Sequence, residues 1–277
     1  MSLLSCSVRG CGQPLTRGAR TYTCPAGHSH DIARSGYINL LQPQDRRSAR
    51  AGDSPEAVAA RARLLDAGVG RASLEHVIAR VAAPGLAPAA CVVDLGCGSG
   101  EALAMLHALA AISGVGVDLS TAAIESAARR YPDVTWVVAN ADRRIPILDR
   151  RAALVLSLNG RRNAGETARI LGAGGRLLVT VPAADDLIEL RALVQGQAIE
   201  RPRGDALLAE HAAHFELVER SIVREQARLV PDQLADMLRG TYRGRRTSAA
   251  ARVAALPGMD LTLAMEIFLF TPKSTFI

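Results

Sequence analysis

The chain is almost without lysine and poor in aromatic residues, and both shortages limit what its charge can show. Lys273 is the single lysine, so 32 of the 33 basic side chains are arginine. Aromatic residues make up only 3% of the sequence, whereas hydrophobic residues make up 49% and support a folded core. Because a GC-rich genome favours alanine and arginine codons, arginine richness alone does not indicate nucleic-acid binding. The 277 residues suffice for one α/β domain and a small appendage.

Long apolar runs are also missing from the sequence. No window of about 18 uninterrupted apolar residues occurs, so we expect no membrane partner. The opening MSLLSCSV has neither a basic segment nor an adequate apolar stretch, so we expect a cytoplasmic protein with no secretory signal. The five cysteines are Cys6, Cys11, Cys24, Cys91 and Cys97. In a cytoplasmic chain, the close group of three indicates metal binding and not disulfides.

The positive charge is concentrated at the N-terminus. Residues 1–50 contain seven arginines and two aspartates, a net charge of +5, which leaves +1 of the total of +6 for the rest of the chain. This distribution fits a small basic module that brings a polyanionic substrate to a neutral enzyme body. The alternative is a solvated basic tail with no binding role.

The N-terminal cysteines and one histidine form a candidate structural zinc site. Three thiols and an imidazole are the donors of a closed tetrahedral site, and about 35 residues need such a metal to fold. His30 is a substitute for the histidine ligand, and three unrelated free cysteines are the alternative interpretation. The gap of four residues between the first two cysteines is wide for such a site. The candidate ligands are Cys6, Cys11, Cys24 and His28.

The segments around this site set the expected organisation of the chain. Residues 16–24 read as a hairpin, and residues 31–41, DIARSGYINLL, read as a strand or extended segment that returns to the body. Residues 42–55 are polar and turn-rich, and a helix begins at Pro55 with Ser54 as its cap. We therefore expect a zinc-binding RNA-recognition module at 1–41, a linker with a lead-in helix at 42–75, and a catalytic domain at 76–277.

The strongest signal is a strand, a glycine-rich turn and a helix over 91–104, CVVDLGCGSGEALA. Glycines let the backbone approach a ligand, and the helix amides face a negative group such as the methionine carboxylate of S-adenosylmethionine. A dinucleotide fold requires the spacing G-x-G-x-x-G, but Glu101 stands where its third glycine would be. The motif Asp-x-Gly-x-Gly-x-Gly is the S-adenosylmethionine form of the loop. Its cofactor-binding candidates are Asp94, Gly96, Cys97, Gly98 and Gly100.

Further strands follow in the order that a methyltransferase requires. A second strand at 115–120 ends in Asp118 and Leu119, where an acidic group takes the ribose hydroxyls, and a third at 135–142 brings Asn140 and Ala141 to the adenine. Strands follow at 153–158 and 176–182, and a closing pair at 215–229 and 261–271 encloses a helical insertion. The order predicts an α/β class I Rossmann-like methyltransferase with a seven-stranded, mostly parallel sheet.

The cysteine module, DIARSGYINLL, DLGCGSG and RILGAGGRLLVTVP occur in an order that resembles the bacterial large-subunit rRNA guanine-N1-methyltransferases, the RlmA and TlrB family. The similarity covers almost the whole chain. It implies a structural zinc module and a catalytic domain that together bind a 23S rRNA hairpin or the large ribosomal subunit, in a homodimer. Some members of the family confer resistance to macrolide-type antibiotics. The family's zinc ligands and cofactor loop correspond to the residues named above.

The sequence departs from the family at the expected acceptor site. After the fourth strand it reads Leu158-Asn159-Gly160-Arg161-Arg162 where the family has an Ala-Pro pair near an aromatic. We take Asn159, which could orient a base edge, and Arg161 as the candidate catalytic residues, with Arg162 beside them. The arginines could hold phosphate or stabilise a developing negative oxygen on the base. No carboxylate is evident there, so the sequence names no general base. Tyr242 is the candidate for stacking on RNA.

Three functions are consistent with these features. The first is methylation of a guanine N1 in 23S rRNA. The second is a small-molecule N- or O-methyltransferase of secondary metabolism on the same scaffold, which the altered acceptor loop favours. The third is a non-catalytic RNA-binding protein with a vestigial cofactor site, against which the intact loop from Asp94 to Gly100 argues.

Overall fold

The computed structural model describes residues 3–43, 52–82, 85–160, 162–241, 253 and 256–273. The strands of its main sheet are β4 (Ile38–Asn39), β5 (Cys91–Leu95), β6 (Ser113–Asp118), β7 (Thr135–Val138), β8 (Ala152–Leu158), β9 (Leu171–Pro182), β10 (Phe215–Leu229) and β11 (Met259–Pro272). They lie in the order β10-β11-β9-β8-β5-β6-β7-β4. Strands β4 to β9 are parallel to one another, and β11 is antiparallel to both β9 and β10.

The predicted class I methyltransferase sheet is confirmed, and one strand is added to it. Seven strands match the expected ones, while β4 extends the edge beside β7 with Ile38 opposite Val137. Strand β7 is shorter than expected, because the chain turns after it. The side-chain oxygen of Asn140 accepts a hydrogen bond from the Asp142 backbone N–H at 3.0 Å, which closes that turn.

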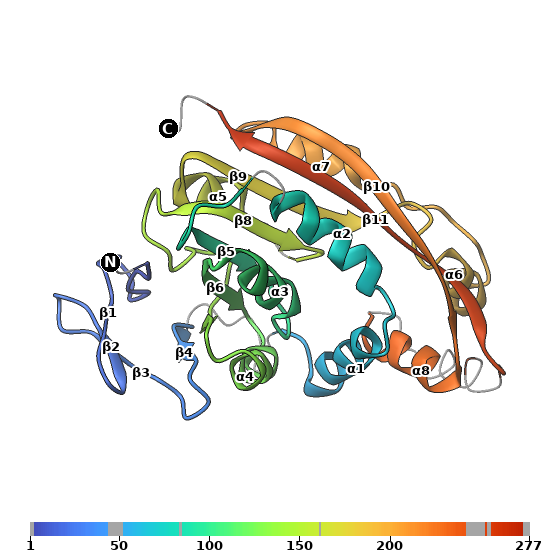
Figure 1. Cartoon of the computed structure of the whole chain (residues 1–277), viewed down its shortest axis with the longest axis horizontal. Helices are drawn as coiled ribbons and strands as arrows, with labels where there is room; N and C mark the ends of the chain where they lie inside the picture. Colours follow the sequence, from blue (N-terminus) through green and yellow to red (C-terminus); the bar gives the residue numbers. More distant parts are fainter. Residues whose placement is uncertain are drawn as a thin grey trace.

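Helices cover both faces of the sheet (Figure 1). Helices α2 (Arg71–Ala82), α3 (Glu101–Ala110) and α4 (Thr121–Arg130) pack on one face, around the buried Trp136. Helices α5 (Ala164–Ile170) and α7 (Gly204–His211) pack on the other face, together with the N-terminal module. Helix α6 (Ile188–Gln195) lies against β11. In the described part of the chain, no helix is long and apolar enough to cross a bilayer.

The N-terminal module is a small antiparallel sheet of β1 (Thr16–Arg17), β2 (Thr21–Thr23) and β3 (Ser29–Asp31). The first two strands form the predicted hairpin. The module's Leu4, Leu15 and Tyr22 belong to the same buried cluster as the residues of the catalytic sheet. The structure therefore does not divide at two of the expected domain boundaries. Strand β4, from the segment assigned to the module, completes the main sheet, and α2 crosses the position expected to separate linker and catalytic domain.

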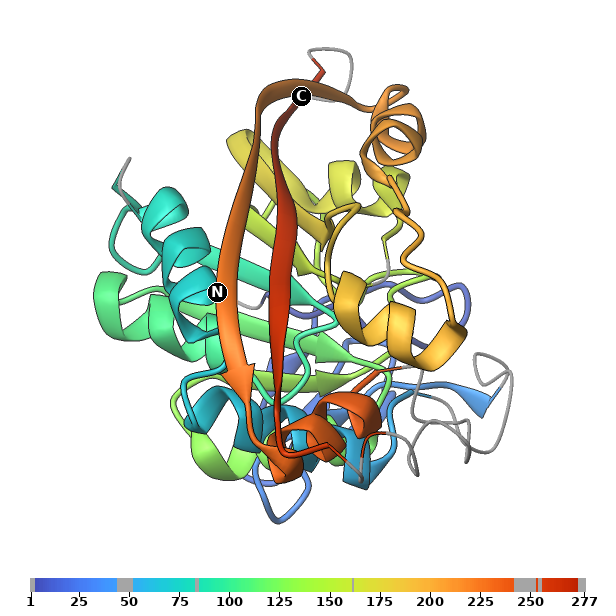
Figure 2. The ribbon, with the colours of Figure 1, turned by 90° about the vertical axis from the view of Figure 1, so that its right-hand side faces the viewer.

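The two antiparallel strands at the other side of the sheet are long, and a helix follows one of them at the edge where the parallel strands end. Strands β10 and β11 extend well past their neighbours, and α8 (Pro231–Arg239) follows β10 at that end (Figure 2). Helix α8 packs on α1 (Pro55–Asp66), whose predicted cap is confirmed, because Ser54 Oγ accepts from the Ala57 N–H at 3.2 Å. Just before α1, the Asp53 carbonyl accepts a hydrogen bond from Ser120 Oγ at 2.8 Å, beside the end of β6. Helices α1 and α8 thus lie beside the edge of the sheet where the parallel strands end and where the cofactor is expected.

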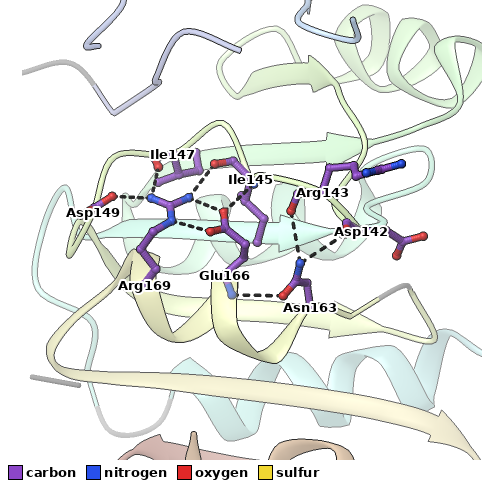
Figure 3. A network of polar contacts seen from close by, with 8 residues as sticks. All are labelled: Asp142, Arg143, Ile145, Ile147, Asp149, Asn163, Glu166 and Arg169. Carbon is purple, nitrogen blue, oxygen red and sulfur yellow. Dashed lines mark hydrogen bonds and ion pairs between the residues drawn. The ribbon is translucent and has the colours of Figure 1, made fainter. Parts of the chain in front are cut away.

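A partly buried ion-pair network fixes the loop on which the module rests (Figure 3). The Arg169 guanidinium binds Glu166 at 2.6 Å and donates to the carbonyls of Ile145 and Ile147 at 2.8 and 2.9 Å. The same loop pairs with the module, because the Ser5 N–H donates to the Pro146 carbonyl at 3.0 Å. A charged hydrogen-bond network of this kind holds a loop without regular secondary structure in one conformation.

Candidate functional site

The four predicted zinc ligands lie together in the module. Their donor atoms are all within 4.8 Å of one another. His28 Nδ1 is 3.5 Å from Cys6 Sγ and 3.4 Å from Cys24 Sγ, and the Cys11 and Cys24 sulfurs are 3.8 Å apart. A tetrahedron with Zn–S bonds of about 2.3 Å has edges of about 3.8 Å. The donor set and spacing therefore fit one zinc ion with four protein ligands, which leaves no position for a reacting water.

Backbone N–H groups prepare this site for thiolates. Burial opposes ionisation of the Cys24 thiol, but hydrogen bonds from the backbone of His28 and Ala26 outweigh it and lower its pKa to about 7. The buried Cys6 differs, because desolvation raises its pKa to about 11. His30, the alternative ligand, places Nε2 3.6 Å from Cys6 Sγ, within hydrogen-bond distance of that sulfur, and is not part of the group of four. His28 is thus the histidine that the structure groups with the three thiols.

The cofactor candidates meet where β5, β6 and β7 end. The Gly96 N–H donates to the Val117 carbonyl at 2.8 Å, which holds the glycine-rich loop against the end of β6. Asp118 fixes the loop from the other strand, because its two carboxylate oxygens accept from the N–H groups of Gly98 (3.0 Å) and Ser120 (2.7 Å). A carboxylate has about four acceptor positions, so Asp118 can still accept from two hydroxyls.

The glycines of the loop serve different purposes. Gly98, at φ +55°, has nothing within 4 Å of the place where a Cβ would stand, so this side of the loop is open to a ligand. A Cβ on Gly100 would overlap the indole ring of Trp136, so this glycine is required by core packing and by its φ of +88°. The expectation that missing Cβ atoms serve close approach to a ligand therefore applies to Gly98, while Gly100 has a packing reason.

Asp94 supplies a test of whether the loop fits S-adenosylmethionine. Its side chain is fully buried, and within the described residues nothing hydrogen-bonds to its Oδ1 atom. Burial, with added repulsion from the nearby Asp118 and Glu101, raises the pKa of Asp94 to about 7. A buried acid without a partner is costly unless a donor or a positive charge comes to it. A cationic ligand at the open Gly98 side meets that need.

The remaining cofactor candidates border the same edge. Leu119 follows Asp118 and is half-buried, while Ala141 lies buried in the turn after β7. Asn140 uses its side-chain oxygen to close that turn. The structure therefore places the predicted ribose and adenine positions on neighbouring strands, next to the glycine-rich loop.

The candidate acceptor loop begins beside the cofactor loop. Asn159 follows β8 in the left-handed region, at φ +55°, and its N–H donates to the Thr180 carbonyl at 3.1 Å. A Cβ on Gly160 would come within 2.5 Å of the Leu95 carbonyl oxygen, so only glycine allows this approach. Arg161, the second catalytic candidate, lies outside the described residues. Arg162 is described, and its NH1 donates to the Gly160 carbonyl at 3.2 Å.

This loop forms one wall of a cavity of about 370 Å³. The other wall is the start and inner side of α7, which contributes Arg203, Leu207 and Glu210. Arg162 Nε and Glu210 Oε2 lie 3.5 Å apart, so the two walls are joined by an ion pair. The sequence shows no carboxylate in this loop, but the structure brings Glu210 to the loop from α7. No local signal pointed to Glu210, because it reaches the loop only through the packing of α7.

Of the three tyrosines considered for RNA contact, two pack in the protein and the third lies outside the described residues. Tyr22 is buried with the module's core residues, and Tyr37 packs against the core cluster that contains Trp136, so both are packing residues. Tyr242 lies outside the described residues, with the arginines that follow it. The module presents charge instead, because the side chains of Arg9, Arg17, Arg20 and Arg34 are all exposed.

Comparisons with known proteins agree with both parts of this structure. Residues 5–49 match the family described as "RlmA, N-terminal", a zinc ribbon, and residues 92–175 match a methyltransferase domain family. The chain is 37% identical over 270 residues to the 23S rRNA (guanine(748)-N(1))-methyltransferase of Streptomyces fradiae, covering 95% of each protein. It is 34% identical to a Micromonospora griseorubida protein whose name assigns it 23S rRNA guanine-N1 methylation, covering 97% of each.

Solved structures support the fold. A Haloferax volcanii protein named as a methyltransferase, in complex with a methyltransferase activator, superposes with a TM-score of 0.52 at 21% identity, over 81% of this chain and 99% of that one. A Galdieria sulphuraria protein named as a sarcosine dimethylglycine methyltransferase gives 0.50 at 15%, over 75% and 87%. The fold is that of S-adenosylmethionine-dependent methyltransferases, joined to a zinc ribbon.

Proposed function

This chain belongs to the 23S rRNA (guanine-N1-)-methyltransferase family, and from that premise we propose that it methylates N1 of a guanine in a 23S rRNA hairpin. The observation that carries the proposal is similarity to the Streptomyces fradiae enzyme along 95% of both chains, which includes the module as well as the catalytic domain. A small-molecule enzyme would not need the module. The proposed substrate places the protein with ribosomes in the cytoplasm.

The cofactor role is assigned to the residues around the glycine-rich loop. We propose that the ribose hydroxyls donate to Asp118, that the turn at Asn140 and Ala141 and the side chain of Leu119 border the adenine, and that Asp94 faces the positive end of the cofactor. S-adenosylmethionine supplies a methyl group bound to a sulfonium. A nucleophile attacks the methyl carbon in line, and the sulfur leaves as a thioether. The chain's task is then to hold the guanine in line with that methyl.

The zinc module is assigned to substrate binding. Cys6, Cys11, Cys24 and His28 hold a structural zinc ion, which sets the shape of a module whose exposed arginines can contact phosphate. The module rests on the loop fixed by Arg169, next to the turn that borders the adenine site. RNA bound to the module would therefore lie near the catalytic edge. A homodimer, which the family resemblance implies, belongs to the same proposal and can be checked by light scattering.

The experiment is labelling of rRNA with methyl-labelled S-adenosylmethionine. Purified protein is incubated with 23S rRNA that lacks native modifications, and the labelled nucleotide is located by primer extension. We expect one guanosine in a hairpin loop, labelled by the wild-type protein and not by the Asp118→Ala variant. Binding of S-adenosylmethionine without labelling of naked rRNA or ribosomal particles would contradict the proposal and move the acceptor to another class of molecule.

A further inference from the structure

The cavity beside the acceptor loop has the chemistry of a pocket for a flipped guanine. Its volume of about 370 Å³ lies within the range of about 300–1,000 Å³ that small-ligand pockets occupy. Val181, Pro182, Pro202 and Leu207 give it apolar walls, which suit the faces of a base. Base-modifying enzymes take their target out of the stack and read its Watson–Crick edge with polar side chains in such a pocket.

The polar groups of the cavity match that edge. Guanine presents N1–H and the N2 amino group as donors next to the O6 acceptor. Glu210 offers a carboxylate acceptor, and Arg162 offers guanidinium donors 3.5 Å away. A phosphate would fit less well, since the carboxylate of Glu210 would repel it. The arrangement therefore favours a guanine base over a backbone group.

The cavity also borders the cofactor loop through Gly160. Asn159 and Gly160 line it, and Gly160 is packed against the Leu95 carbonyl, directly before the first glycine of the loop. A base in the cavity thus lies beside the cofactor loop. Glu210 is half-exposed and held by a single ion pair, so its carboxylate can exchange Arg162 for a base.

We propose that Glu210 is the general base of the methyl transfer, and that Arg162 stabilises the guanine O6; this rests on the proposed function. Glu210 accepts the proton from N1. The electron pair left on N1 forms the bond to the methyl carbon, while the bond from that carbon to sulfur breaks and its pair stays on sulfur. Negative charge that develops on O6 meets the Arg162 guanidinium. The proton on Glu210 then passes to water, so the carboxylate is restored.

The test compares Glu210→Gln and Glu210→Ala with Asp205→Asn, a matched control that removes a carboxylate from the same helix outside the cavity. Asp205 pairs with Arg220 at 3.0 Å on an exposed surface. We expect Glu210→Gln to lower kcat on the rRNA hairpin at least about 100-fold. The RNA dissociation constant, measured by fluorescence anisotropy, should change less than about threefold, and binding of S-adenosylmethionine should not change. Asp205→Asn should behave as wild type.

A pH profile separates proton transfer from a merely structural role. Among the described residues, the charged and titratable groups near Glu210 are Arg162, Arg203, His211 and His214, and all four are kept in Glu210→Gln. The residual rate of this variant should rise in proportion to hydroxide concentration, because N1 must then lose its proton to solvent. The wild-type rate should level off above neutral pH.

The outcomes remain distinguishable from those of the proposed function. If wild-type protein labels no rRNA, the proposed function fails. If wild type labels rRNA and both Glu210 variants keep its kcat, Glu210 is not the base. A loss confined to RNA affinity, or a pH profile like that of wild type, would likewise overturn the inference.

Discussion

Arginines occur in both the module and the long strand β10, but their surroundings differ. In the module, Arg9, Arg20 and Arg34 are exposed and form no ion pair with any residue that the structure describes. In β10, Arg220 pairs with Asp205 and Glu266, Arg224 pairs with Asp185, and Arg228 pairs with Asp260. Composition gives both sets the same weight. Of these two sets, the arginines of the module are the ones whose charge no described carboxylate pairs.

The two regions also reach a fixed structure by different means. The catalytic sheet buries long apolar strands between two helical layers. The module has three strands of two or three residues, and its ligand cluster occupies the place of a core. We therefore expect the module to depend on zinc and the catalytic domain to be independent of it.

Removing zinc should produce the largest effect, and it should abolish the function of the module while leaving cofactor binding by the catalytic domain intact. Cys24→Ala, or treatment with a chelator, should reduce rRNA methylation more than about 100-fold because the module loses its shape. The affinity for S-adenosylmethionine, measured by calorimetry, should stay within about threefold. Cys91→Ala, which removes a buried thiol from β5, is the matched control and should keep both zinc and methylation. Loss of cofactor binding together with zinc would show that the two regions fold as one unit.

Changing Asp118 should have the opposite effect: it should weaken cofactor binding and leave the zinc module intact. Asp118→Ala removes two backbone hydrogen bonds that shape the glycine-rich loop, together with the proposed acceptor for the ribose. We expect the dissociation constant for S-adenosylmethionine to rise about 100-fold, which corresponds to about 2.7 kcal/mol. Zinc content, measured by atomic absorption, should not change. Asp133→Asn, on an exposed loop, serves as control, and an equal effect of both substitutions would refute the assignment.

The pH dependence of cofactor binding should be smaller. The pKa of Asp94 is raised to about 7, so this acid is largely protonated below pH 7 in the free protein. A cationic ligand favours the ionised form, so binding should weaken as the pH falls through 7, by about tenfold between pH 8 and pH 6. Asp94→Asn should bind more weakly and lose this step, while keeping any titration of the cofactor itself. An unchanged step in the variant would exclude Asp94 as its source.

Paired substitutions of arginine should show the smallest effect and test the opening comparison directly. Removing Arg9 and Arg20 together should weaken RNA binding several-fold and lower the slope of log affinity against log salt by about 2. Removing Arg224 and Arg228 together changes the net charge equally but takes away arginines that are already paired. We expect that variant to retain the wild-type slope. Equal slopes for both variants would mean that overall charge, and not the module, attracts the RNA.

Much of the site could be predicted because its signals are local. The spacing of Asp94, Gly96, Gly98 and Gly100 encodes a turn between a strand and a helix, and that turn is observed. Cys24 and His28 lie on one turn, and the hairpin between Cys11 and Cys24 brings the other ligands to them. The class of the sheet, mostly parallel with a closing antiparallel pair, followed from the alternation of apolar strands with helices. Backbone geometry over a few residues determines such features.

The tertiary structure alone decided which distant residues face one another. Strand β4 joined the main sheet because the edge of β7 was open to it, and the turn closed by Asn140 ended the third strand early. The packing of Trp136 against Gly100 explains why this position requires glycine, and α7 brought Glu210 to Arg162. These contacts depend on how whole elements pack across the sheet. Spacing along the chain carries no record of that packing, whereas it does fix the local turns that hold the cofactor and the zinc.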